Sequence, residues 1–366
     1  TSVTVDGTLA LNGTGGNFVY AENTPDAPAE VSVKDNGAVN LTGNGTVGSL
    51  TNAGGTATGT SAILTAGQGA TQTVQGEIKL DKVTIGTGTV NVAKNVSTNT
   101  LTLDGNLSNA VDTSVAGSTA NSITATTLTQ NGGTLVTNNL TLGASGGTST
   151  TSELKGVVTA DSITIQQASS TAAGQGNVVH IINDSLVAAD KFTAASGSVI
   201  NVGTDGDGDS GTSSTGTLDV GSLVLNGATL TIDPIYGLDY AATIVNNLSQ
   251  NNTLDGSVNI GQNSILAVGF EDRAELDQFL SENKLLGANG SLQAQYGSLL
   301  IVNDTMTIAD NYGVALDGTK TPTAATDAIT VNSGAAIVVT EDAFGGRDGN
   351  GELNGSYAIK FENSDN

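Results

Sequence analysis

The chain has 366 residues, enough for two or three ordinary domains or for one long repetitive domain. It carries 35 acidic side chains against 11 basic ones, a formal net charge of −24, so we expect neither nucleic acid nor an anionic membrane surface as a partner. Only 13% of the residues are charged, about half of the usual ~25%, so the surface must consist mainly of Thr, Ser, Asn and Gly.

Short runs in which apolar and polar residues alternate recur along the chain, separated by Gly or Asn. Strict alternation of this kind indicates β-strands, and Gly or Asn at the breaks allows left-handed backbone conformations. The clearest runs, in chain order, are 3–13, 31–43, 123–143, 222–233, 299–308 and 329–339.

The run "SLVLNGATLTID" (222–233) shows the ambiguity of the pattern. Its apolar residues lie on both sides of Asn226-Gly227, the strongest short-range signal for a β-hairpin, and this signal favours stacked antiparallel β-sandwich domains. A parallel β-helix instead stacks coils of two or three short strands. We favour the β-helix because the strands are very short, the turns are irregular, and the interior is aliphatic with no Trp.

Two regions are expected. Residues 1–203 are predicted to form regular β-helix coils, and residues 204–366 a decorated continuation with a loop-rich C-terminal end. The decorations, in chain order, are an acidic loop (204–216), a turn or bulge (233–240), a short amphipathic helix (270–287), and two loops (319–328 and 341–355) before a frayed tail.

The segment "FEDRAELDQFLSENKLLG" is the only convincing helix in the sequence. It places Glu271 and Asp272 in the first turn, and Gly287 closes it. Its apolar stripe comprises Ala274, Leu276, Phe279, Leu280 and Leu285. An amphipathic helix inside a solenoid must pack on a flank or cover an end.

One metal site is a candidate. Asp205, Asp207 and Asp209 present three carboxylates at alternate positions of a flexible loop, and Ca²⁺ binds six to eight hard oxygen ligands. A complete twelve-residue calcium loop has Gly at position six and Glu at position twelve, where this chain has Ser210 and Gly216. Calcium is therefore the only cofactor considered, and the alternative is an acidic loop that keeps the protein soluble.

No enzymatic constellation is visible, and we predict that the chain is not an enzyme. His180 is the only histidine and lies in an apolar run, where a structural or outward-facing role is expected. Arg273 and Arg347 are the only arginines, and no Trp offers a stacking platform for sugar rings. A glycosidase would need two convergent carboxylates.

The chain has no cysteine and no apolar stretch of about 18 residues, so it lacks disulfides and is not itself expected to span a membrane. Absence of cysteine suits an exported bacterial protein. Because the sequence begins at Thr1 and shows no signal peptide, we expect a mature or excised segment of a longer protein.

Runs such as "ITATTLTQNGGTLVTNNLTLG" (123–143) and "SLVLNGATLTID" resemble the passenger domains of bacterial autotransporter (type V secretion) adhesins. The resemblance lies in degenerate repeats, richness in Thr, Asn and Gly, acidity and absence of Cys, and it covers most of the chain. It implies a right-handed parallel β-helix displayed at the outer membrane or released from the cell. Its implied roles are cell adhesion, autoaggregation, biofilm formation and virulence.

We therefore expect an adhesin that acts through a polar flank of a rigid rod, located at the bacterial cell surface or outside the cell. Its expected partners are a second copy of itself, or a glycan or protein of a host surface or matrix. Two alternatives are a surface-layer lattice protein and a glycan-degrading β-helix enzyme.

Overall fold

The computed structural model describes most of the chain and places it in two compact units. Unit 1 comprises Thr1–Gly143 together with Ser152–Ile163, and unit 2 comprises Ala144–Thr151 together with Thr164–Asn366. The described residues are 2–5, 8–19, 30–33, 38–52, 63–68, 70–170, 172, 175–204, 215–233, 240–248, 252–287, 292–293, 297–317 and 329–362. The predicted boundary after residue 203 separates the regular coils from the part of the sequence with inserted loops and a helix. This boundary stays a prediction.

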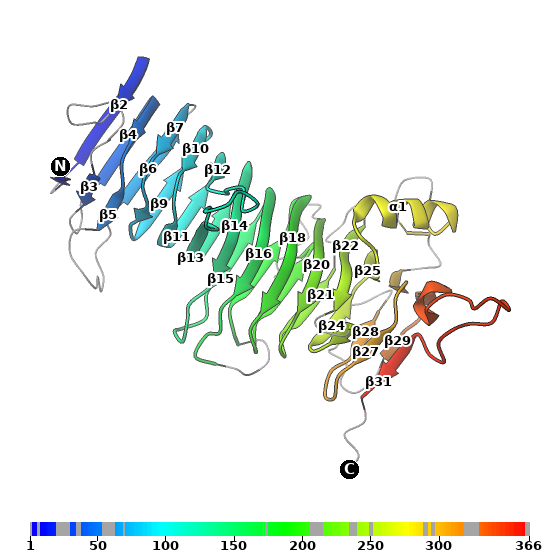
Figure 1. Cartoon of the computed structure of the whole chain (residues 1–366). Coiled ribbons are helices and arrows are strands. Elements are labelled where there is room, and N and C mark those ends of the chain that lie inside the picture. Colours follow the sequence, from blue (N-terminus) through cyan, green and yellow to red (C-terminus); the bar gives the residue numbers. More distant parts are fainter. Residues whose placement is uncertain are drawn as a thin grey trace. The chain divides into compact units, whose positions relative to one another are not determined.

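Unit 1 is built of three ladders of short strands, all of them parallel (Figure 1). The first ladder contains β1 (Ser2–Val5), β3 (Glu30–Val33), β5 (Leu50–Asn52), β8 (Ile78–Lys79), β11 (Val96–Leu103), β13 (Ser122–Gln130) and β14 (Thr134–Leu142). The second contains β2 (Thr8–Val19), β4 (Ala38–Val47), β6 (Ile63–Gln68), β9 (Lys82–Ile85), β11, β13 and β15 (Thr151–Leu154). The third runs from β4 through β7 (Thr71–Val74), β10 (Thr89–Val92) and β12 (Asn106–Ser108) to β14.

The register of these ladders shows stacked coils. Val90 pairs with Leu107 and Leu9 pairs with Val39, so a coil of unit 1 takes between 17 and 30 residues. Inward positions form aliphatic columns, such as the one that runs through Val83, Leu101 and Leu128, all with no exposed surface. This is a parallel β-helix, so the fold prediction is confirmed and the antiparallel sandwich alternative is wrong.

One corner of unit 1 is built from glycines that touch the backbone of the preceding coil. A Cβ on Gly105 would lie 2.2 Å from the carbonyl oxygen of Gly86, and a Cβ on Gly133 would lie 2.0 Å from the carbonyl oxygen of Gly105. Gly156 continues the column, since its Cβ would lie 2.5 Å from the carbonyl oxygen of Gly133. Successive coils approach closely here because the side chains are missing.

Unit 2 has the same construction, with longer connections between its strands. Its first ladder contains β17 (Val178–Ile181), β19 (Val199–Val202), β21 (Thr229–Ile232), β24 (Ser257–Ile260), β28 (Val314–Leu316) and β29 (Ile329–Val331). Its second contains β18 (Ser185–Ala194), β20 (Gly216–Val224), β22 (Ala241–Leu248), β25 (Ser264–Val268), β26 (Ser298–Val302) and β30 (Ala335–Val339). A smaller third ladder contains β23 (Thr253–Leu254), β27 (Met306–Ile308) and β31 (Ile359–Phe361). The strand β16 (Val157–Ile165) spans the boundary between the units.

The Asn226-Gly227 pair turns a corner within a coil and does not form a hairpin. Asn226 and Gly227 both have positive φ, 45° and 82°, as a tight turn requires, and β20 and β21 on either side belong to different parallel ladders. The four alternating residues around the turn, Leu223, Leu225, Leu230 and Ile232, are all buried as predicted. The turn chemistry was therefore predicted correctly and the strand pairing suggested by it was wrong.

The helix α1 (Arg273–Glu282) is shorter than the predicted 270–287. Asp272 caps its start by accepting a hydrogen bond from the backbone N–H of Glu275 at 2.9 Å, and Asn283 ends it. Leu276 and Leu280 are buried, whereas Ala274 is exposed, so the apolar stripe is narrower than expected. Phe270 lies before the helix and packs edge-to-face on Phe279, with ring centroids 5.5 Å apart.

The helix covers the outward side of the second ladder of unit 2. The buried cluster that joins them comprises Tyr240, Ala242, Ile244, Ile265, Ala267, Phe270, Leu276, Leu280, Leu285, Leu292, Leu299 and Ile301. Strands β25 and β26 are consequently buried on both faces. The expectation that the helix packs on a flank is confirmed. In the described part of the chain, no helix has the length and apolar character needed to cross a lipid bilayer.

The predicted loop 341–355 contains a short 3-10 helix, Asp342–Phe344, and an isolated antiparallel bridge between Arg347 and Leu353. The predicted turn at 233–240 and loop at 319–328 lie mostly or wholly outside the described residues. The predicted frayed tail is "FENSDN" (361–366), and its first residue, Phe361, belongs to β31.

Candidate functional site

The third ladder of unit 1 presents a regular outward surface of hydroxyl and amide groups. We call it the β10 face and define it as the outward side chains of Thr71, Thr73, Thr89, Asn91, Asn106, Ser108, Thr134 and Val136. Each of them alternates with a fully or nearly buried residue of the same strand, as in a sheet with one solvated side. The β10 face is the first candidate for a binding surface.

Two columns of side chains cross the β10 face from coil to coil. One column joins Thr73, Asn91, Ser108 and Val136, and the other joins Thr71, Thr89 and Asn106. Within the second column, the Asn106 amide donates to the Thr89 hydroxyl at 3.4 Å and accepts from the backbone N–H of Thr134 at 3.0 Å. Adjacent groups of one column are spaced by the distance between strands, about 4.8 Å.

The other two ladders of unit 1 present similar residues, with charges among them. In the first ladder, Lys79 stands between Thr51 and Ser97. In the second, Lys82 lies beside Thr100, and Glu153 beside Thr129.

A network of asparagines fastens the 109–121 loop to the coils of unit 1. The Asn121 amide donates to the carbonyl oxygens of Ala93 at 3.0 Å and Asn109 at 2.8 Å. The Asn138 side chain accepts from the backbone N–H of Val111 and donates to Asp161 at 2.9 Å. Between the loop and the coils lies an open hollow of about 390 Å³, lined by Ala93, Lys94, Asn95, Val111, Gly117, Ser118, Thr119 and Asn121. Its lining mixes polar and apolar groups in similar measure and includes one cationic side chain, that of Lys94.

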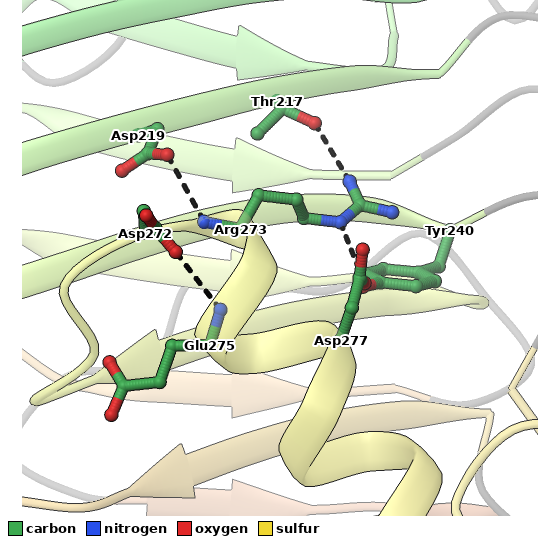
Figure 2. Close-up of polar contacts among 7 residues, drawn as sticks. All are labelled: Thr217, Asp219, Tyr240, Asp272, Arg273, Glu275 and Asp277. Carbon is green, nitrogen blue, oxygen red and sulfur yellow. Dashed lines mark hydrogen bonds and ion pairs between the residues drawn. The ribbon is translucent and has the colours of Figure 1, made fainter.

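In unit 2, a polar cluster anchors α1 to the strands beneath it (Figure 2). The Arg273 guanidinium lies over the Tyr240 ring, 4.0 Å from its centroid, and donates to the Thr217 hydroxyl at 2.9 Å. It also donates to Asp277 at 3.0 Å, and the Tyr240 hydroxyl donates to the same carboxylate. The backbone N–H of Arg273 donates to Asp219 at 3.2 Å. The cation stacks on the ring while its N–H groups are engaged, so the cluster fixes the start of the helix.

Asp219 is half-buried under this helix start. Burial raises the pKa of its carboxyl above the ordinary value, the hydrogen bond from Arg273 opposes this rise, and the nearby charge of Asp272 adds to it. The arrangement holds a protein segment in place and leaves no group directed at a ligand in the described contacts.

A second pair of carboxyl groups in unit 2 flanks a glycine. Asp233, Gly261 and Asp317 directly follow paired residues of β21, β24 and β28. A Cβ on Gly261 would lie 2.3 Å from the Asp233 carboxylate, so that carboxylate occupies the space of the absent side chain. Burial and then the charge of Asp317 raise the pKa of Asp233 from 3.8 to about 6.

Asp233→Asn is expected to stabilise the protein above pH 6 and to have little effect below pH 4. Since the folded-state pKa of Asp233 is raised, its protonated form favours folding, and that contribution is lost as the pH rises from 3.8 to about 6. Allowing for its partial exposure to solvent, we expect a gain of about 1 to 2 kcal/mol in unfolding free energy at pH 8. Urea denaturation at pH 4 and pH 8 measures it, with exposed Asp190→Asn as the matched control. A gain of equal size at both pH values would contradict the assignment.

The predicted calcium ligands Asp205, Asp207 and Asp209 lie outside the described residues. Within the segments that are described, no group of three or more His, Cys, Asp or Glu side chains is placed to hold a metal ion. The Asp205 loop therefore stays a prediction.

His180 has the contacts of a structural histidine. It pairs in register with Asn201 and is only 7% exposed. Its Nδ1 lies 3.2 Å from the Thr204 carbonyl oxygen and 3.2 Å from the Asn201 amide nitrogen. Arg347, the second arginine, forms a two-pronged exposed ion pair with Glu341, at 2.6 and 2.8 Å.

The sequence did not point to Tyr240 or to the asparagine network. Tyr240 stands at the end of a segment whose Pro and Gly predict only a turn, and in the structure it anchors α1 through its contacts with Arg273 and Asp277. For the network, a signal was present for two members: Asn109 and Asn121 each stand next to a strand end, where an amide can satisfy backbone groups of a neighbouring coil, whereas Asn138 lies in the middle of β14.

Comparison with known proteins gives no identification. No family model matches the chain, and neither does any curated protein or any solved structure.

Proposed function

We propose that this chain is the passenger of a bacterial cell-surface adhesin that acts through outward polar faces of its β-helix. The observation that carries the proposal is the β10 face, a repeated surface of Thr, Ser and Asn side chains held in columns by the coil register. In this proposal the protein is displayed outside the cell and promotes adhesion or aggregation. It performs no chemical reaction.

The physical basis is summation of weak contacts. A single surface hydrogen bond contributes only about 0.5 to 1.5 kcal/mol, because it replaces a bond to water. A face that repeats its donors and acceptors from coil to coil offers many such bonds at once. Many copies displayed on one cell multiply the effect, since each contact raises the effective concentration for the next.

The net charge of −24 sets a condition on this function. Two acidic chains repel each other, so attractive contacts must outweigh the repulsion, or dissolved ions must reduce it. Aggregation is therefore expected to respond to ionic strength or to calcium.

The test is a suspension of beads coated densely with the full chain. We expect clumping of coated beads, or their retention on host-matrix surfaces, under some combination of ionic strength and calcium, whereas beads coated with an unrelated acidic protein stay dispersed. If the coated beads neither clump nor bind a matrix surface anywhere in this range, the adhesive function is wrong. Ordered two-dimensional arrays on adding calcium would instead identify a surface-layer protein.

A further inference from the structure

Charge is distributed unevenly between the two units. Unit 1 holds 11 acidic and 5 basic residues, and unit 2 holds 24 acidic and 6 basic residues. The net charges are thus −6 and −18. Repulsion between two copies is weakest where unit 1 meets unit 1.

Within unit 1, the β10 face stands out because none of its eight defining residues is ionisable. Its extension on β4 offers only Asn44 and Thr46, and its extension on β16 offers Val157 and Thr159, beyond which the exposed carboxylate of Asp161 bonds to Asn138. The nearest charges in sequence are Glu77, Lys94, Asp104, Lys155 and Asp161; the first four lie between strands, and Asp161 lies within β16. The other two ladders carry lysine or glutamate on their outward sides.

We propose that the β10 face is the self-association surface of this protein, and that its occupant is the β10 face of a second copy. This inference rests on the proposed adhesive function. It identifies the binding partner as a second copy of the chain and the binding surface as the β10 face. The same face on both copies makes the contact isologous, so that it closes as a two-fold pair. Hydroxyl and amide groups of Thr73, Asn91 and Ser108 then meet their counterparts, and Val136 and Val157 add apolar area.

The size of the face makes a single contact weak. Six strands at about 4.8 Å, each showing three or four residues at about 3.3 Å, cover roughly 300 Å² per copy. A stable interface buries about 800 Å² per partner. The free protein is therefore expected to be monomeric, and association is expected only where many copies are displayed together.

The charge distribution also fixes the direction of the salt effect. The repelling charges lie outside the contact, and the screening length falls from about 30 Å at 0.01 M to about 8 Å at 0.15 M ionic strength. Clumping of beads coated with the full chain should therefore increase as salt is added. Sodium chloride should act as well as calcium chloride at equal ionic strength, because the contact needs no bridging cation.

The decisive experiment places a charge in the centre of the face. Asn91 is exposed on β10, so Asn91→Asp and Asn91→Lys both put like charges opposite each other when a variant meets itself. Each variant alone should clump about tenfold less than the wild-type chain, since like charges then face each other across the contact. A mixture of Asp-bearing and Lys-bearing beads should clump again, which a mere loss of folding would not produce.

A matched pair of substitutions locates the surface. Ser108→Asp lies on the β10 face and should reduce clumping, whereas Ser97→Asp lies on the first ladder beside Lys79 and should leave it unchanged. Circular dichroism of each variant checks its folding. The β10 face is not the self-association surface if Asn91→Asp and Ser108→Asp beads clump as well as wild-type beads, or if only calcium supports clumping. In either case the proposed adhesive function still stands. If wild-type beads never clump, self-association itself is overturned.

Discussion

Replacing Leu101 by Asp is expected to abolish the stable fold of unit 1. Leu101 has no exposed surface and lies between Val83 and Leu128 in an inward aliphatic column. A carboxylate at this point would be buried without a partner and would also leave the volume of the leucine unfilled. We expect a loss of more than about 4 kcal/mol in unfolding free energy.

The neighbouring substitution Thr100→Asp is the matched control. Thr100 lies on the same strand, but its side chain points outward, beside Lys82 of the preceding coil. Its replacement should change the unfolding free energy by less than about 0.5 kcal/mol. Urea denaturation followed by circular dichroism measures both variants. Equal effects at positions 100 and 101 would show that the inward and outward sides of β11 are assigned wrongly.

Gly133→Ala is expected to destabilise unit 1 by about 3 kcal/mol or more, through backbone strain together with a clash. Gly133 has φ of 70°, and its Cβ would lie 2.0 Å from the Gly105 carbonyl oxygen and 2.9 Å from the Gly105 Cα. The obstacle is backbone, which cannot rotate away as a side chain would. Relief requires the coils at this corner to move apart, which weakens the hydrogen bond from Val157 N–H to the Gly133 carbonyl oxygen.

Gly132 provides the control for this corner, since it is the adjacent residue of the same turn. A Cβ on Gly132 would approach nothing closer than the Asp104 carbonyl oxygen at 3.9 Å. Gly132→Ala should therefore be neutral or slightly stabilising, because Ala restricts the unfolded chain more than Gly does. Thermal unfolding of both variants separates the two cases. Similar melting temperatures for Gly132→Ala and Gly133→Ala would contradict the described close approach.

Much of the fold could be predicted because its signal is local. Alternation in 222–233 identified the inward leucines correctly, since the side of a strand on which a residue lies depends only on its parity. The strand that pairs with it could not be inferred so directly. Asn226-Gly227 supports both a hairpin and a coil corner, and only the long-range stacking of β20 on β22 distinguishes them.

The helix was also predictable only in part: its presence follows from the sequence, but its ends do not. Asp272 and the spacing of Leu276 and Leu280 identify it, but its ends depend on what packs nearby. Phe270 and Leu285 look like helical residues in the sequence, whereas in the structure they join the buried cluster from outside the helix.

The candidate surface was harder to predict than the fold. Sequence composition predicted a polar flank but not which one, because the charge-free character of the β10 face emerges only when residues 71–74, 89–92 and 106–108 are brought into one ladder. The tyrosine anchor of α1 likewise depends on contacts between helix and strand residues that are 33 to 56 positions apart in the sequence.

The coil register has a consequence for how such a surface can change. Strand pairing in unit 1 requires only that a few residues of each coil align, while the connections between them vary, so that a step of 17 residues and one of 28 both support the third ladder. A duplicated or deleted coil would therefore lengthen or shorten the β10 face by one row without disturbing the rows on either side. The strength of a multivalent contact could in this way be adjusted in steps, through the number of repeats alone.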